Sequence, residues 1–351
     1  MKKKMFLVPF ILASTLSFFF ATFPFGAAVL PDDEVEALRE IAEALGKTDW
    51  NFSADPCSGS QYGWIKLNQP EGIVNNVTYL AAWAWQSWAG RHLCRILKGQ
   101  NLPGTLPPDL AKLPYLQQID LTRNYLNGSI PPGWESYCSS LLGNRLTGSI
   151  PKELGNITTL KNFTVEFNQL SGNLPPELGD MSSIERFRIS DNFFSGKIPD
   201  YIQNWTKLEK LLLSLNYFTG ELPDSFAGLI TLKDFRISDN RFSGKIPNYI
   251  QNWKKLGKLV IQAGGLNWPI PLGVALLEKL SDLRISDLNG SEEPFPPLNN
   301  LTHLKTLILG SCNITGWLPE FLGGYDNVEN LVSIVATFLS FFCLLIFQKF
   351  S

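Results

Sequence analysis

Four arginines near the middle of the chain have the type and spacing needed to bind carboxylates. Arg186 and Arg188 flank Phe187, and Arg236 and Arg284 follow Arg188 at intervals of 48 residues. The planar guanidinium group of arginine can donate two parallel hydrogen bonds to one carboxylate. On an extended strand, residues two apart point to the same face, so Arg186 and Arg188 would lie side by side. We therefore predict that these four arginines bind an acidic or carboxylate-bearing ligand.

A repeated pattern of apolar residues and asparagines positions these arginines. A marker position, usually asparagine, recurs every 24 residues, except for one step of 20 residues. Apolar residues recur eight, five and three residues before it. This period is typical of a leucine-rich repeat solenoid, an α/β fold in which stacked repeats bury one another's apolar faces. The markers indicate about ten repeats over 96–325: Gln100, Asn124, Asn144, Asn168, Asn192, Asn216, Asn240, Gly264, Leu288 and Cys312.

The alternation of apolar and polar positions predicts a short strand in each repeat, with one buried face. Arg188, Arg236 and Arg284 lie four residues before a marker and are expected to point outward. The marker asparagine is expected to turn inward and bond neighbouring backbone. Cys312, on the marker column, is expected to be a buried structural thiol. An alternative for the arginines is that they are solvated strand residues paired with Asp191, Asp239 and Asp287.

Both ends of the chain have targeting features. Three lysines at 2–4, an apolar stretch at 6–20 and small residues before the cleavage point predict a signal peptide over 1–28, with an uncleaved anchor as the alternative. The apolar segment 331–347 predicts a transmembrane helix followed by a cytoplasmic tail, 348–351. The alternative is that this tail is not a natural end of the protein. Nine N-x-[ST] sequons predict a glycosylated extracellular region: Asn51, Asn76, Asn127, Asn156, Asn162, Asn204, Asn289, Asn300 and Asn313.

Residues 29–95 are expected to form an N-terminal cap. Apolar residues recur on one face of a predicted helix over 32–46, which would cover the open edge of the first repeat. Cys57 and Cys94 are expected to form a disulfide bond, because extracellular proteins fold in an oxidising compartment. Cys138 has no obvious partner.

The composition disfavours several functions. The net charge of −2 gives no reason to expect a nucleic-acid partner. The chain has two histidines, and His303 lies in a polar segment typical of a surface. We predict no catalytic residues, no metal site and no cofactor. Two whole repeats are duplicated, since the sequence of 187–192 recurs at 235–240.

An L-x-G-x-[IL]-P signature ends several repeats, at 126–131, 146–151 and 170–175. Together with 97–102 and 119–128, these segments resemble the plant leucine-rich-repeat receptor-like serine/threonine kinases that carry a malectin-like domain after the repeats. No glycine-rich phosphate loop, H-R-D or D-F-G sequence occurs, so we predict that this chain is not itself an enzyme.

The resemblance implies a recognition ectodomain at the plasma membrane, single-pass and type I, with the repeats outside the cell. Its implied partners are a peptide, glycan or protein ligand, a co-receptor kinase and the membrane. Arg186 and Arg188 also resemble the R-x-R pair with which plant peptide-hormone receptors hold a peptide's C-terminal carboxylate. Two alternatives stay open, namely a fragment of a receptor kinase and a secreted repeat protein that inhibits a foreign enzyme.

Overall fold

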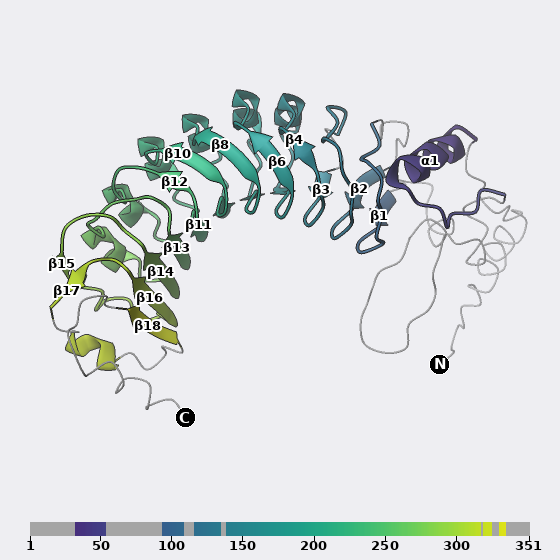
Figure 1. Cartoon of the computed structure of the whole chain (residues 1–351). Helices are drawn as coiled ribbons and strands as arrows, with labels where there is room; N and C mark the ends of the chain where they lie inside the picture. Colours follow the sequence, from purple (N-terminus) through teal and green to yellow (C-terminus); the bar gives the residue numbers. More distant parts are fainter. Residues whose placement is uncertain are drawn as a thin grey trace, which may run out of the picture.

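The computed structural model describes residues 32–53, 93–108, 116–134, 138–316, 319–324 and 330–334. These residues form a curved arch (Figure 1). Parallel strands line its inner, concave side, short 3₁₀ helices lie on its outer side, and a second set of strands runs along one flank. The architecture is the predicted leucine-rich repeat solenoid.

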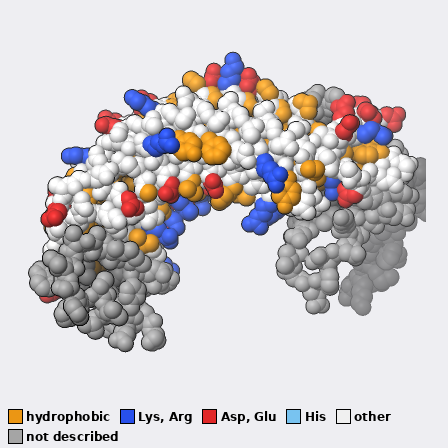
Figure 2. Space-filling view, in the orientation of Figure 1, with side chains coloured by type: hydrophobic (Ala, Val, Ile, Leu, Met, Phe, Trp, Pro, Cys, Tyr) orange, Lys and Arg blue, Asp and Glu red, His pale blue; other side chains and the backbone are white. Residues whose placement is uncertain are grey.

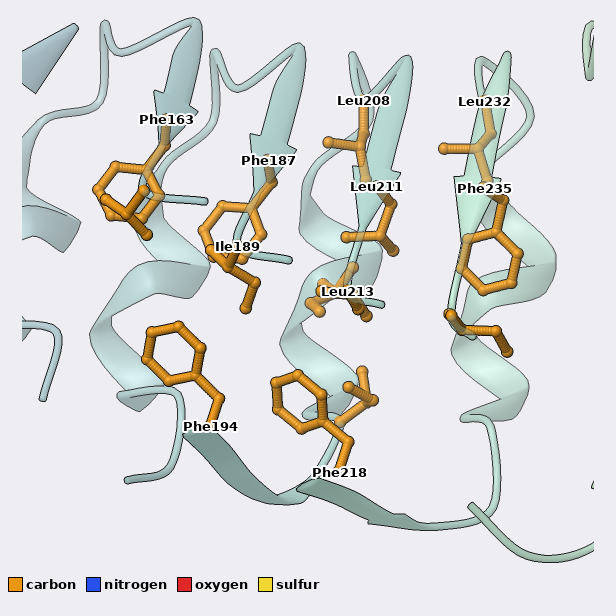
Figure 3. Packing of buried hydrophobic residues seen from close by; sticks show 14 of the residues in the cluster. Phe163, Phe187, Ile189, Phe194, Leu208, Leu211, Leu213, Phe218, Leu232 and Phe235 are labelled. Atoms are coloured by element: carbon orange, nitrogen blue, oxygen red, sulfur yellow. The ribbon is translucent and has the colours of Figure 1, made fainter. Parts of the chain in front are cut away.

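An eight-stranded parallel sheet forms most of the concave side. Residues 24 apart face each other across neighbouring strands, as in the series Phe163, Phe187, Leu211 and Phe235, whose side chains are fully buried (Figure 3). The strands are β5 (Asn162–Thr164), β7 (Arg186–Arg188), β9 (Lys210–Leu212), β11 (Asp234–Arg236), β13 (Lys258–Gln262), β14 (Asp282–Ser286), β16 (Thr306–Gly310) and β18 (Asn330–Ile334). Three earlier strands, β1 (Leu93–Ile96), β2 (Leu116–Asp120) and β3 (Cys138–Ser140), pair among themselves.

The L-x-G-x-[IL]-P signature forms the flank and the outer side. Its first residues pair in a five-stranded second sheet of β4 (Thr147–Gly148), β6 (Gln169–Gly172), β8 (Phe193–Lys197), β10 (Tyr217–Gly220) and β12 (Arg241–Phe242); β15 (Glu293–Pro294) pairs with β17 (Ile314–Thr315). Its proline has extended backbone and precedes a 3₁₀ helix. These helices are η3 (Lys152–Asn156), η4 (Pro176–Asp180), η5 (Asp200–Asn204), η6 (Asp224–Gly228), η7 (Asn248–Asn252), η8 (Leu272–Leu276) and η9 (Glu320–Gly324).

The marker asparagines point inward and satisfy buried backbone, which confirms the prediction. Asn192 is typical. Its Nδ2 donates to the carbonyl oxygens of Val165 and Ile189 at 3.0 and 3.2 Å, and its Oδ1 accepts from the backbone N–H of Leu170 at 3.0 Å. Equivalent bonds are made by Asn124, Asn144, Asn168, Asn216 and Asn240.

Cys312 occupies the marker position of its repeat with its sulfur buried. The Sγ atom lies 3.1 Å from the carbonyl oxygen of Gly310. Burial raises the pKa of the Cys312 thiol to about 11, so the thiolate form is disfavoured. The expected buried structural thiol is confirmed, because an unreactive neutral sulfur fills the space of the asparagine.

Helix α1 (Asp32–Leu45) packs against the first repeat, close to the predicted bounds. It ends where Gly46 adopts a left-handed conformation with φ of 66°. The backbone N–H of Thr105 donates to the Ala44 carbonyl at 2.7 Å. A Cβ at Gly104 would lie 2.0 Å from the same carbonyl oxygen, so only glycine permits this approach. The apolar face of α1 joins the core through Ala37, Leu38, Ile41, Ala42 and Leu45.

Several sequence-based predictions fall outside the described residues. The signal peptide 1–28, Cys57 and Asn76 lie there, and Cys94 is described only as backbone in β1. The Cys57–Cys94 disulfide therefore stays a prediction. The tail 348–351 also lies outside.

The C-terminal strand overlaps the predicted membrane span. β18 pairs with β16 with Leu331 opposite Leu307, so the 24-residue register continues into 331–334. These four residues of the predicted span 331–347 are strand and not helix, whereas 335–347 lie outside the described residues. Within the described part of the chain, no helix has the length and apolar character required to cross a membrane.

We predict that Asn192→Ala destabilises the solenoid by about 1–3 kcal/mol, because it leaves buried backbone groups without partners. The measurement is the free energy of unfolding by chemical denaturation. Asn173→Ala is the control, since Asn173 is exposed and its loss should change stability by less than about 0.5 kcal/mol. Equal effects of the two variants would contradict the structural role of the marker asparagine.

Candidate functional site

The four predicted arginines lie on the concave sheet. Strand pairing places Arg188, Leu212, Arg236, Val260 and Arg284 in one row across β7, β9, β11, β13 and β14. Arg186 lies in the neighbouring row of the same face, opposite Lys210. Lysine and arginine side chains gather along the inner rim of the arch (Figure 2). The structure therefore brings all four onto one surface, as predicted.

Two of these arginines are already paired with an aspartate of their own strand. On β11, Arg236 donates from Nε and Nη2 to the two carboxylate oxygens of Asp234, at 2.8 and 2.7 Å. On β14, Arg284 donates in the same way to Asp282, at 2.7 and 3.2 Å. Lys258 also contacts Asp282. Hydrogen bonds from Arg284 and Lys258 outweigh the effect of burial and lower the pKa of Asp282.

Strand β7 has no such aspartate. The position of Asp234 is occupied there by Arg186, so two guanidinium groups share one face of the strand. Arg186 Nη1 donates to the side-chain oxygen of Asn162 at 2.9 Å. Its nearest carboxylate in the described chain is that of Glu209, 4.0 Å away, and Lys233 already donates to that carboxylate at 2.5 Å. The charge of Arg186 is thus weakly compensated.

Arg188 pairs with Glu166, which lies two residues after the end of β5 in the preceding repeat. Its Nη2 lies 2.5 Å from Oε2 of Glu166, whose side chain is 5% exposed. Burial raises the pKa of Glu166, although the neighbouring Arg188 charge acts in the opposite direction. Sequence analysis did not select Glu166. The sequence does contain a sign of this residue, because Glu166 stands at the repeat position where the following repeats have Ser190, Ser214 and Ser238.

The alternative sequence interpretation named the wrong aspartates. The arginines do pair with carboxylates, but with Glu166, Asp234 and Asp282 and not with Asp191, Asp239 and Asp287. The latter three lie one residue before the marker, with positive φ, where the chain turns from the concave sheet to the second sheet. Side chains two residues apart on one strand share a face, which explains the observed Asp234–Arg236 and Asp282–Arg284 pairs.

Basic residues outnumber acidic ones over the described part of this face. Arg186, Arg188, Lys210, Arg236, Lys258 and Arg284 lie on the strands with Glu166, Asp234 and Asp282 among them or beside them. Leu212 and Val260 separate successive arginines. An extended acidic segment with apolar side chains would match this alternation of charge and hydrocarbon.

Eight of the nine sequon asparagines are described, and all eight are exposed: Asn51, Asn127, Asn156, Asn162, Asn204, Asn289, Asn300 and Asn313. Asn162 is on the concave face, where its side-chain oxygen accepts the bond from Arg186. A glycan at Asn162 would therefore border the arginine pair. His303 is exposed, and the described ranges contain no group of three or more side chains placed to hold a metal ion.

Comparison with known proteins agrees with this architecture. The Leucine Rich Repeat family profile matches residues 115–137, 183–205, 207–229, 231–253 and 303–325. A protein of Arabidopsis thaliana described as a probable leucine-rich repeat receptor-like serine/threonine-protein kinase is 48% identical over 147 residues, which are 40% of this chain and 14% of that protein. A second Arabidopsis thaliana protein of the same description is 41% identical over 136 residues, 38% of this chain and 13% of that protein.

Two receptors are among the solved structures that resemble this one. A TDR receptor superposes with a TM-score of 0.62 and 30% identity, covering 65% of this chain and 40% of the receptor. The plant peptide hormone receptor RGFR1, in complex with RGF2, gives a TM-score of 0.58 and 25% identity, covering 69% of this chain and 45% of that receptor. The repeats and these relatives support the resemblance to plant leucine-rich-repeat receptor-like kinases, of which this chain matches a small part.

We predict that Arg188→Ala destabilises the protein, because it leaves the buried carboxylate of Glu166 without its cation. The expected loss at neutral pH is about 1–2 kcal/mol, less than for a fully buried pair because Arg188 is partly exposed. Burial raises the folded-state pKa of Glu166, and Arg188 no longer opposes this in the variant, so the lost stability should return as the pH falls through the variant's pKa and the carboxyl is protonated.

Thermal and chemical denaturation over a pH series measure this effect. The double variant Arg188→Ala, Glu166→Gln is the control and should regain stability at neutral pH. A loss that is independent of pH and persists in the double variant would show that Arg188 acts through packing instead.

Proposed function

We propose that this chain is the extracellular recognition region of a plant leucine-rich-repeat receptor-like protein and binds its ligand on the concave face. The observation that carries the proposal is the arginine pair of β7. The neighbouring arginines of β11 and β14 are each held by an aspartate, whereas Arg186 takes the place of that aspartate and is weakly compensated. A carboxylate from outside the chain would complete this pairing.

The proposed ligand is a peptide with a free C-terminal carboxylate. The carboxylate would meet Arg186 and Arg188, and the peptide would extend over Leu212 and Val260 towards Arg236 and Arg284. RGFR1, one of the similar structures, is a peptide hormone receptor in complex with RGF2, and this supports a peptide over other ligand classes. An electropositive surface also speeds the encounter with an acidic peptide.

The remaining partners and the place of action belong to the same proposal. We assign the repeats to the cell exterior, with a co-receptor kinase as partner and single-pass anchoring in the plasma membrane. The similar Arabidopsis proteins are described as kinases, and kinase activity of a longer product, with a malectin-like domain after the repeats, is a hypothesis for the whole protein.

The decisive variant is Arg186→Asp. This change makes residues 186–192 identical in sequence to 234–240, so that β7 acquires the aspartate–arginine pair of β11. The fold should form, because the same sequence is already accommodated two repeats later, and any loss of stability should not exceed that of Arg188→Ala, since Glu166 at worst shares Arg188. We expect peptide affinity to fall by about 2–5 kcal/mol, since the added carboxylate would compete for Arg188.

Calorimetric titration of the secreted protein with a library of acidic peptides measures this loss. Each peptide is tested with a free and with an amidated C-terminus, and amidation should weaken binding to the parent but not to Arg186→Asp. Asp234→Asn is the matched control on β11, where no loss is expected. If the parent and Arg186→Asp bind the same peptides equally, the concave arginines are not the ligand site.

A separate prediction concerns the cell exterior. Protein secreted from plant cells should lose the mass of several N-glycans on glycosidase treatment, because the eight described sequons are exposed. Asn162→Gln should remove one glycan and give peptides freer access to Arg186. A secreted protein with no mass shift would contradict the extracellular assignment.

A further inference from the structure

Exposed apolar side chains gather along one edge of the arch, away from the concave arginines. Phe167, Phe193, Leu215 and Tyr217 are 54, 45, 48 and 41% exposed. They lie one residue before or after three consecutive marker asparagines, where the chain turns from the concave sheet to the second sheet. We call these four residues, with Arg241, the edge surface. Figure 2 shows hydrophobic and basic side chains adjoining on the flank that carries the second sheet.

Two members of the edge surface adopt a backbone conformation that suits them poorly. Phe167 and Leu215 have φ of 57° and 56°, in the left-handed region. Asp191 and Asp239 take the same turn in the alternating repeats, and aspartate is among the residues that tolerate it. A bulky apolar residue there gains little from burial, because about half of each side chain stays exposed. The fold therefore does not explain why these positions are apolar.

The other members form a short stack. The rings of Phe193 and Tyr217 are nearly parallel, with centroids 6.0 Å apart, and the guanidinium of Arg241 lies 4.5 Å from the centre of the Tyr217 ring. Among the residues that the structure describes, no carboxylate forms an ion pair with Arg241. Aromatic residues and arginine are the types enriched at the centres of protein–protein interfaces.

The sequons leave this flank open. Asn156 and Asn204 end η3 and η5 on the outer side, and Asn162 lies on the concave side. On the second-sheet flank, Asn127 precedes β4. The next sequon on this flank is Asn289, which forms an isolated β-bridge with Asn267, beyond β12. The five strands between them carry no sequon. A macromolecule can approach this stretch without meeting a glycan.

We propose that the edge surface docks a protein partner that presents apolar side chains beside a carboxylate. The apolar side chains would cover Phe167, Phe193 and Leu215, and the carboxylate would pair with Arg241 next to Tyr217. A protein fits better than a sugar, because Phe167, Phe193 and Leu215 offer no hydrogen-bonding group to hydroxyls. The site is separate from the concave arginines and does not depend on the proposed ligand.

The test selects a random phage-displayed peptide library on the secreted full chain carrying Arg186→Asp, which removes the concave pair. Two kinds of variant then probe the edge surface. Phe167→Asn with Leu215→Asn removes apolar contacts and places a residue that tolerates the left-handed turn, so thermal stability should hold or rise. Tyr217→Asn turns 217–219 into an N-x-T sequon and places a glycan on the surface.

The matched control is Lys254→Thr, which completes a sequon at the exposed Asn252. Asn252 occupies the repeat position of Asn156, Asn204 and Asn300, on the outer side. We expect selected peptides to combine aromatic or aliphatic residues with aspartate or glutamate. They should bind both edge variants about tenfold more weakly or worse, and bind Lys254→Thr as they bind the parent.

Four results would overturn the proposal. The first is a selection that yields no apolar–acidic peptides, and the second is peptides that bind the Tyr217→Asn variant unchanged. The third is an oligosaccharide that binds the parent on an array and no longer binds the edge variants, while peptide binding is unchanged in those variants. The fourth is sedimentation showing a dimer that dissociates in those variants, which would make a second copy of this chain the occupant. Loss of concave peptide binding in Arg186→Asp tests the proposed function separately.

Discussion

The structure depends on the hydrogen bonds that an inward asparagine makes to buried backbone in six repeats, from Asn124 to Asn240. A solenoid repeat turns several times within 24 residues, and each turn exposes backbone groups that the strands do not pair. Asn192 satisfies such groups in its own repeat and in the preceding one, where it reaches Leu170 and Val165. One side chain therefore closes the turn and fixes how two repeats stack. The apolar core can fill only because these polar groups are already bonded.

Fixed stacking is what gives the concave face its order. Because residues 24 apart lie opposite each other on neighbouring strands, a residue type that recurs in the sequence becomes a row on the surface. Arg188, Arg236 and Arg284 form such a row with Leu212 and Val260 between them. The backbone of β7 and β11 is equivalent, so exchanging one aspartate for Arg186 changes the charge of the face without changing the fold.

The turn that follows the concave sheet separates two surfaces of different chemistry. Before it lie the charged residues of the concave strands, and around it lie the apolar members of the edge surface. The edge surface carries no sequon and the concave side carries one, at Asn162, whereas the outer side carries sequons at Asn156, Asn204 and Asn300. A curved frame with most of its sequons on the back can hold a small ligand and a larger partner at neighbouring positions.

The sequence by itself determined the solenoid, the inward and outward columns, the asparagine bonds and the helix at 32–45. Each follows from a period in the chain, because repeats with the same apolar positions stack to bury one continuous core. It also placed Arg186, Arg188, Arg236 and Arg284 on one face. The sequence did not determine which carboxylate each arginine meets. Glu166 reaches Arg188 from the segment that follows β5, and Asp234 rather than Asp239 reaches Arg236.

Only the tertiary structure decided those pairs, because they depend on side-chain direction across strands and on the turn that directs Asp239 away. The same holds for the edge surface, since the sequence does not predict that Phe167 and Tyr217 are exposed, and the fold shows that they are. It holds also for β18, where the 24-residue register continued into a segment whose apolar composition had indicated a membrane helix. Pairing with a preceding strand is a property of the stack, and composition alone does not contain it.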